Sequence, residues 1–90
     1  MQRVFEVSKE NKNKVENILK KDDLVSRQSI TMRIFDDNAY FLIEGEEEAI
    51  KRAEELLKDL AKIAKNEQEI IKKIKEEEEQ ALVGFGSILG

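Results

Sequence analysis

The sequence of 90 residues contains no cysteine, histidine, tryptophan or proline. The absence of cysteine excludes a disulfide framework, a thiolate nucleophile and a cysteine-ligated metal centre. The absence of histidine removes the commonest general base and the commonest transition-metal ligand. The four serines therefore have no histidine to activate them as nucleophiles. We expect a protein that is not an enzyme and that binds no cofactor.

Long apolar runs and glycine-rich loops are also scarce. No run approaches the ~20 apolar residues that span a bilayer. The first seven residues contain no apolar signal segment. None of the glycines belongs to a phosphate-binding motif. The sequence therefore predicts a cytoplasmic protein with no membrane segment and no phosphate loop.

Charge is abundant but unevenly distributed. Charged residues make up 40% of the chain, and the formal net charge is −4. Residues 1–43 carry eight basic and seven acidic side chains, for +1, whereas residues 44–90 carry eight basic and thirteen acidic ones, for −5. An acidic half disfavours general binding to nucleic acid or to an anionic membrane. The richness in lysine and glutamate is typical of proteins from thermophiles.

The first half of the chain has the pattern of a strand, a helix and a hairpin. Residues 3–7 predict a short strand, and Ser8 is a suitable N-cap for a helix over residues 9–21. Residues 26–35 alternate in polarity as a half-buried strand does. A turn of two aspartates and an asparagine then leads to an apolar strand over residues 39–43.

Residues 46–80 predict one unusually long helix after the strand break at Gly45. Its acidic first turn suits the positive end of a helix dipole. Its apolar residues keep a spacing near 3.6 until the stripe weakens around Asn66. The expected fold class is α+β, a βαββα two-layer sandwich. Its three-stranded antiparallel sheet has the order 1-3-2, and both helices cover one face.

The second helix is too long for this sheet, because residues 46–80 would span about 52 Å at 1.5 Å per residue. We therefore expect a core domain over residues 1–65, a helical extension or third helix over residues 66–80, and an apolar, glycine-rich tail over residues 81–90. Three alternatives stay open for the extension. It breaks near Asn66 and folds back, it pairs with a second copy as a short coiled coil, or it frays into solvent.

Apolar side chains late in the sequence predict a partner-binding surface. The tail is uncharged, and exposed aromatic and aliphatic side chains there would form an association patch. Several alternatives stay open for the tail: docking on its own sheet or in a dimer, addition to a sheet edge, insertion in a partner's groove, or disorder. The candidate partner-binding residues are Ile70, Ile71, Ile74, Leu82, Val83, Phe85, Ile88 and Leu89.

Carboxylates gather at the ends of two expected strands. The start of the second strand and the end of the third meet at one edge of the sheet. Hard cations such as Ca²⁺ or Mg²⁺ bind clustered carboxylates, although the same residues also suit a solvated loop and a helix N-terminus. The candidate metal ligands are Asp22, Asp23, Glu44, Glu46, Glu47 and Glu48.

Residues 30–60 combine a hairpin, a glycine, an acidic helix start and an Ala/Leu-rich helix, with the sequence ITMRIFDDNAYFLIEGEEEAIKRAEELLKDL. This stretch resembles the C-terminal half of a KH-type RNA-binding module. The glycine-rich GXXG loop of that family is missing, because Lys20, Lys21, Asp22 and Asp23 stand between the first helix and the second strand. The resemblance therefore assigns no RNA-binding residue. In composition the whole chain is similar to small α+β proteins of thermophilic and methanogenic archaea, which implies no activity.

The expected function is a non-enzymatic interaction domain that forms a homodimer through its long helix and its tail, with the tail as a possible contact for another protein. A divalent-cation binding protein that uses the acidic edge is the alternative. A further alternative is KH-like RNA binding through the first helix, although the acidic balance makes nucleic acid an unfavourable partner. The lysines that would serve it are Lys9, Lys12, Lys14, Lys20 and Lys21.

Overall fold

The structure is a computed structural model that describes residues 1–77. After the last labelled strand, residues 67–77 are helical, and we call this segment the crossing helix. The labelled elements are β1 (Gln2–Ser8), η1 (Lys9–Asn11), α1 (Lys12–Lys21), η2 (Val25–Arg27), β2 (Ser29–Phe35), β3 (Asn38–Glu44), α2 (Glu47–Leu56) and β4 (Lys62–Ile63).

The sheet is antiparallel and has four strands in the order β2-β3-β1-β4. The predicted α+β class and the antiparallel pairing are confirmed, and β3 lies between β1 and β2 as expected. The prediction of three strands is wrong. The two residues of β4 lie within a segment expected to be helical. They pair with β1 instead, with Ile63 opposite Phe5.

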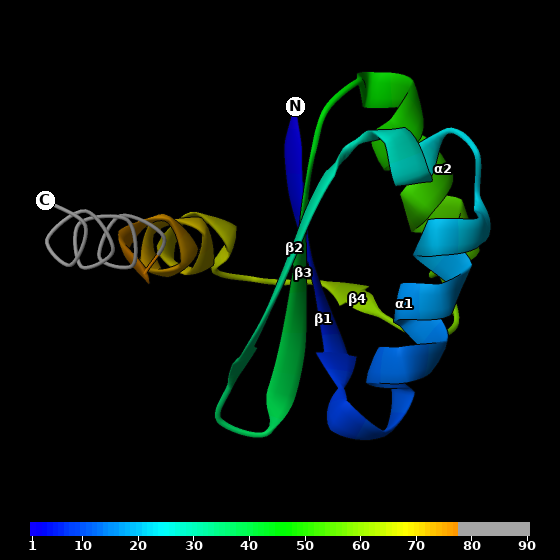
Figure 1. Cartoon of the computed structure of the whole chain (residues 1–90). Coiled ribbons are helices and arrows are strands. Elements are labelled where there is room, and N and C mark those ends of the chain that lie inside the picture. The colour runs from blue at the N-terminus through cyan, green and yellow to red at the C-terminus, as the bar shows by residue number, and fades with distance from the viewer. Residues whose placement is uncertain (78–90) are drawn as a thin grey trace, which may run out of the picture.

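Helices α1 and α2 cover one face of the sheet (Figure 1). Strand alternation directs Phe5, Phe41 and their neighbours to this face, where the apolar stripe of each helix meets them. We call the result the helix-side core. Its buried residues are Phe5, Val7, Val15, Leu19, Val25, Ala39, Phe41, Ile43, Ile50, Ala53 and Leu57.

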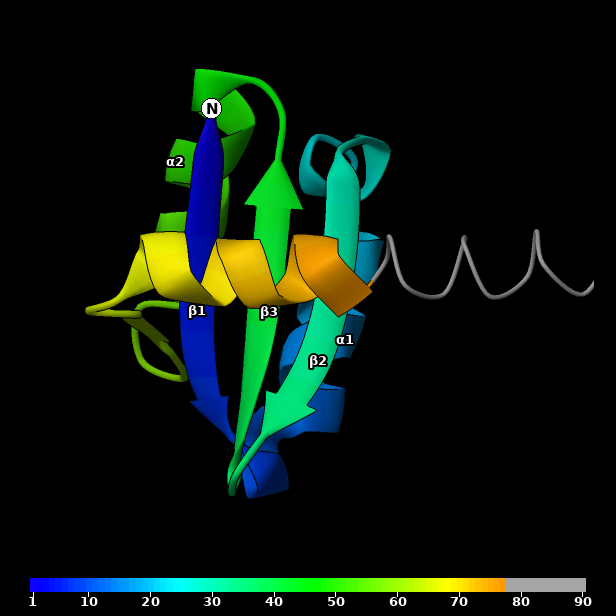
Figure 2. The ribbon, with the colours of Figure 1, turned by 90° about the vertical axis from the view of Figure 1, so that its left-hand side faces the viewer.

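The crossing helix covers the opposite face of the sheet, where it lies across β1, β3 and β2 (Figure 2). Its apolar side chains pack on Val4 and Leu42, which point away from the helix-side core. This second core consists of Val4, Leu42, Ala64, Ile70, Ile71 and Ile74. The fold therefore has three layers, and the prediction of a two-layer sandwich is wrong.

The predicted long helix is also wrong, because α2 ends at Leu56. The carbonyl of Leu57 accepts bonds from the N–H groups of Leu60, at 3.0 Å, and Ala61, at 2.9 Å, which turns the chain. The apolar spacing continues through this turn, but its two halves belong to different cores. The fold-back alternative with a third helix is the one the structure shows, since the new helix starts immediately after Asn66.

Polar contacts attach the crossing helix to the sheet near each end. The Glu67 carboxylate accepts hydrogen bonds from the Val4 backbone N–H at 2.9 Å and from Arg3 Nη1 at 3.0 Å. Further along, Lys75 Nζ lies 2.8 Å from the Glu44 carboxylate on β3. Beside β2, the Glu77 carboxylate lies 3.2 Å from Arg33 Nε. In the described residues, no helix has the length and apolar composition that crossing a membrane requires.

Truncating Ile74 tests whether the crossing helix is part of the folded domain. Ile74 is fully buried, so Ile74→Ala should lower the free energy of unfolding by about 2–5 kcal/mol. Lys72→Ala, at an exposed position of the same helix, is the matched control and should change it by less than about 0.5 kcal/mol. Urea denaturation of both variants measures the difference, and equal unfolding free energies would contradict the second core.

Candidate functional site

Strand β2 forms an edge of the sheet along its whole length. Within residues 1–77 it pairs with β3 alone, over seven residues from Ser29 opposite Glu44 to Phe35 opposite Asn38. An antiparallel strand with a single neighbour leaves the N–H and C=O groups of every second residue unpaired. This edge can therefore accept one more strand.

A small apolar groove lies beside this edge, between α1 and the sheet. Its volume is about 140 Å³. Leu19 and Phe41 are buried beneath it, whereas Ile30 and Met32 of β2 are only partly buried. Glu16 and Lys20 of α1 complete the lining and form an ion pair at 3.0 Å. The groove thus has an apolar interior and a neutral polar rim.

Two further side chains of β2 define this edge. Ile34 leaves 45% of its surface exposed. Arg33 donates from Nη1 to the backbone carbonyl of Met32 at 2.8 Å. This bond supplies a donor that a neighbouring strand would otherwise provide, and a charged side chain in that position protects an edge against unspecific pairing. The same guanidinium contacts Glu77.

The opposite edge of the sheet, beside β1, is more fully paired than the β2 edge. β4 pairs with β1, and the Ala64 N–H then donates to the Val4 carbonyl at 3.0 Å. Glu67 accepts from the Val4 N–H, so both backbone groups of Val4 have partners. Beyond β1 the only labelled strand of the described chain is the two-residue β4, which carries the exposed Ile63. The two edges are therefore unequal, and β2 offers the longer one.

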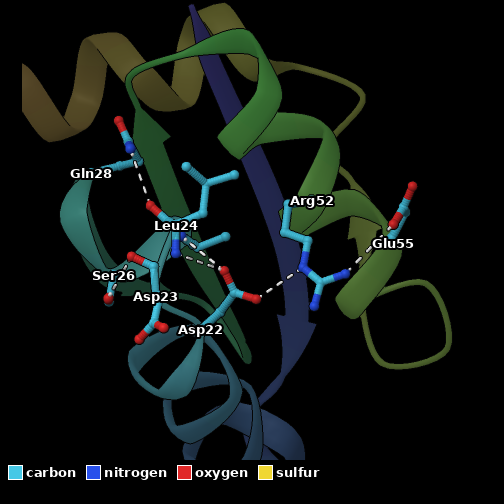
Figure 3. Close-up of polar contacts among 8 residues, drawn as sticks. Asp22, Asp23, Leu24, Ser26, Gln28, Arg52 and Glu55 are labelled. Atoms are coloured by element: carbon cyan, nitrogen blue, oxygen red, sulfur yellow. Dashed lines mark hydrogen bonds and ion pairs between the residues drawn. The ribbon is translucent and has the colours of Figure 1, made fainter.

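The six acidic residues predicted as metal ligands are not brought together. Asp22 Oδ1 accepts from the backbone N–H groups of Leu24 and Val25, at 3.1 and 3.0 Å (Figure 3). Its other oxygen lies 2.9 Å from Arg52 Nε. The Val25 N–H and then Arg52 hold the pKa of the Asp22 carboxyl below its usual value. Asp22 therefore fixes the chain after α1 to α2.

The other predicted ligands are also dispersed. Glu44 pairs with Lys75 and accepts from Gln2 Nε2 at 2.9 Å, and these two contacts lower the pKa of its carboxyl. Glu47 pairs with Lys51 on its own helix, at 3.4 Å. Asp23, Glu46 and Glu48 stand at solvent-exposed positions. Among residues 1–77, no group of three carboxylates is placed to hold a metal ion.

The predicted partner-binding residues divide into two groups. Ile70, Ile71 and Ile74 are at most 8% exposed and pack on Val4 and Leu42 within the same chain. A dimer seam through them would require the crossing helix to leave the sheet. The remaining predictions lie outside the described residues; they are Leu82, Val83, Phe85, Ile88 and Leu89.

The lysines named for RNA binding lie in and around α1. Lys9 lies 3.9 Å from Asp37 of the β2–β3 turn, and Lys20 pairs with Glu16. Both ion pairs reduce the positive potential that phosphate binding requires. RNA binding stays a prediction from the sequence.

A second, wider hollow of about 390 Å³ lies where β1 and β3 meet the segment after α2. Lys62 Nζ contacts Glu6 at 2.9 Å, and the Tyr40 hydroxyl donates to Glu6 at 3.0 Å. Lys62 lowers the pKa of Glu6, whereas burial raises that of Tyr40. Charges of both signs line this open hollow, and Glu6 and Lys62 pair with each other, so we assign it no ligand. Its lining residues are Glu6, Ser8, Asn38, Lys58, Asp59, Leu60, Ala61 and Lys62.

Sequence reasoning recognised β2 as a half-buried strand but did not identify the groove beside it. The alternation of Ile30, Met32 and Ile34 was the available signal, because these side chains all face the α1 side of the sheet. Comparison of the chain with protein-family models, with curated proteins and with solved structures finds no match in any of the three. The resemblance to a KH module therefore also stays a prediction.

The contacts of Asp22 predict a pH-dependent stability. Because the pKa of Asp22 is lowered in the folded state, its ionised form stabilises the fold above the unfolded pKa of about 4. That contribution disappears as the pH falls through the folded pKa. Asp22→Asn should therefore unfold at a lower urea concentration than the unmodified chain near neutral pH, and the gap should narrow towards about pH 2.

Asp23→Asn is the control, because the Asp23 side chain is exposed. It should leave the urea midpoint nearly unchanged across the same pH range. A gap for Asp22→Asn that stays constant from neutral to acidic pH would show that charge is not the origin of the effect.

Proposed function

We propose that this chain is a non-enzymatic interaction domain that self-associates, with the β2 edge and the adjacent groove as the docking surface for a second copy. The observation that carries this proposal is that the seven-residue strand β2 pairs on one side only within residues 1–77 and has an apolar groove beside it. Backbone hydrogen bonds to the edge would supply affinity, and side chains inserted in the groove would supply specificity.

The chemistry of the surface favours an extended, apolar and uncharged occupant. Ile30, Met32 and Phe41 offer aliphatic, thioether and aromatic surface, and the nearby charges of Glu16 and Lys20 compensate each other. A charged peptide would gain no complementary partner there. Burial of the exposed Ile34 would add to the driving force at about 25 cal/mol per Å² of apolar surface.

A second copy supplies such an occupant from the chain's own sequence. One source is β2 itself, which could pair antiparallel with its symmetry mate. The other is the uncharged segment of residues 81–90, whose sequence is ALVGFGSILG. Both sources differ from the seam first expected at Ile70, Ile71 and Ile74, because those side chains already have partners in their own chain.

A matched pair of substitutions at the two edges of the sheet tests the proposal. Ile34 and Ile63 are the same residue type with nearly equal exposed fractions, 45% and 43%, but they lie on β2 and β4. Ile34→Lys should weaken self-association, because an ammonium group would be buried against an apolar partner. Ile63→Lys should leave the association unchanged. Sedimentation equilibrium of the full chain over a wide concentration range measures both.

The proposal requires the unmodified chain to form dimers at accessible concentrations. A monomer at all concentrations would overturn it, and so would equal weakening by the two substitutions. Circular dichroism of each variant verifies that the lysine has not simply unfolded the domain.

A further inference from the structure

We infer that the occupant of the α1–β2 groove is the segment of residues 81–90 of a second copy, which adds as an antiparallel or parallel strand to β2. This inference rests on the proposed function and names the partner segment. It is argued from where the described chain ends, from the chemistry of the groove and from the side-chain alternation of the segment.

The first argument is position. The crossing helix runs over the sheet from β1 to β2 (Figure 2), and Glu77 contacts Arg33 of β2 at 3.2 Å. The described part of the chain therefore ends beside the open edge. Residues 78–90 number thirteen and could extend over about 43 Å, whereas the seven residues of β2 span about 23 Å. Length does not limit docking at this edge.

The second argument is chemical complementarity. Residues 81–90 contain no charged side chain, although 40% of the whole chain is charged. The groove interior is formed by Leu19, Ile30, Met32 and Phe41. An uncharged apolar segment can enter it without the cost of burying an unpaired charge. Outside residues 80–90, no stretch of ten residues in this sequence is free of charged side chains.

The third argument is alternation. In an extended strand, Val83, Phe85 and Leu89 share one side with Ala81 and Ser87. The other side carries Leu82 and Ile88 together with three glycines. The first side therefore presents a nearly continuous row of side chains to the groove. The glycine-rich side would then face the layer of the crossing helix. Because glycine has no side chain, this side adds little bulk on the face of the sheet that the crossing helix already covers.

The sequence before the segment favours delivery to a second copy. Glu78, Glu79 and Gln80 include none of the glycine, proline, asparagine or aspartate residues that reverse a chain. Docking on the chain's own β2 would require the chain to turn sharply there, since the crossing helix meets β2 transversely (Figure 2). Exchange between two copies fills both grooves by the same contact, as two-fold symmetry requires.

Arg33 has a partner at this edge both with and without a docked strand. Its guanidinium donates to the Met32 carbonyl and also contacts Glu77. An incoming strand would replace the first contact with its own backbone N–H. Arg33 would retain Glu77 as its partner, so displacement leaves no unpaired charge.

Engineered cysteines test the exchange, because the chain has none of its own. One variant carries Lys20→Cys at the groove rim, and a second carries Ser87→Cys in the segment. When the two full-length variants are mixed under mild oxidation, we expect a disulfide-linked heterodimer of Lys20→Cys with Ser87→Cys. Lys51→Cys on α2, whose side chain is similarly exposed, is the control and should link at least about tenfold more slowly with Ser87→Cys.

The outcomes separate this inference from the proposed function. Equal linking at positions 20 and 51, or an intrachain disulfide in the monomeric double variant Lys20→Cys/Ser87→Cys, would overturn the exchange. Rapid homodimer formation by Ile34→Cys alone would show symmetric β2 pairing instead. In that case the proposed function stands and the segment is not the occupant. A chain that never dimerises would overturn both.

A second pair of variants tests the orientation of the segment. Phe85→Asp should raise the dissociation constant of the dimer about 100-fold, because a charge would enter the apolar groove. Ile88→Asp, on the glycine-rich side, should raise it less than about tenfold. The reverse order would overturn the assigned alternation, and no effect of either variant would overturn docking of the segment.

Discussion

The structure depends on a sheet centre that is apolar on both faces. Phe5 and Phe41 point to one side of the paired strands β1 and β3, and Val4 and Leu42 point to the other. A sheet of this kind exposes apolar surface unless each face is covered by another layer. Helices α1 and α2 cover the first face, and the crossing helix covers the second. Fixed contacts of Glu67 and Lys75 then place this last helix across the strands.

The sequence predicted the elements that depend on local pattern. The alternation of residues 26–35, the turn after Phe35 and the uniformly apolar β3 were sufficient to place the hairpin and the β1-β3-β2 order. The predicted strand began too early, because residues 25–27 form the short helix η2 and β2 starts at Ser29. The positive φ of 57° at Asp36 agrees with the turn chemistry expected there. The length of the second helix could not be predicted, because its 3.6-residue spacing persists across the turn and the short strand β4 that lie between Leu57 and Asn66. Periodicity reports an apolar face but does not report which core that face joins.

The candidate site was harder to predict for a related reason. The sequence predicted that these carboxylates would lie together at one edge of the sheet. In the structure each pairs with a different basic side chain, Asp22 with Arg52 and Glu44 with Lys75. These partners come from distant parts of the chain. In a chain with 40% charged residues, an acidic cluster found in the sequence is therefore weak evidence for a metal site. The groove became visible only when α1 was placed against Ile30 and Met32.

The unequal edges of the sheet have a consequence for assembly size. Fibrous growth by strand addition needs a template at both sides of every sheet, so that each added molecule offers a new one. Here β2 provides a seven-residue template, whereas the labelled strand at the opposite edge, β4, has only two residues. The Glu67 carboxylate also accepts the hydrogen bond of the Val4 N–H of β1. Joining at β2 therefore consumes the long template without creating another. The architecture favours termination at a closed pair over propagation.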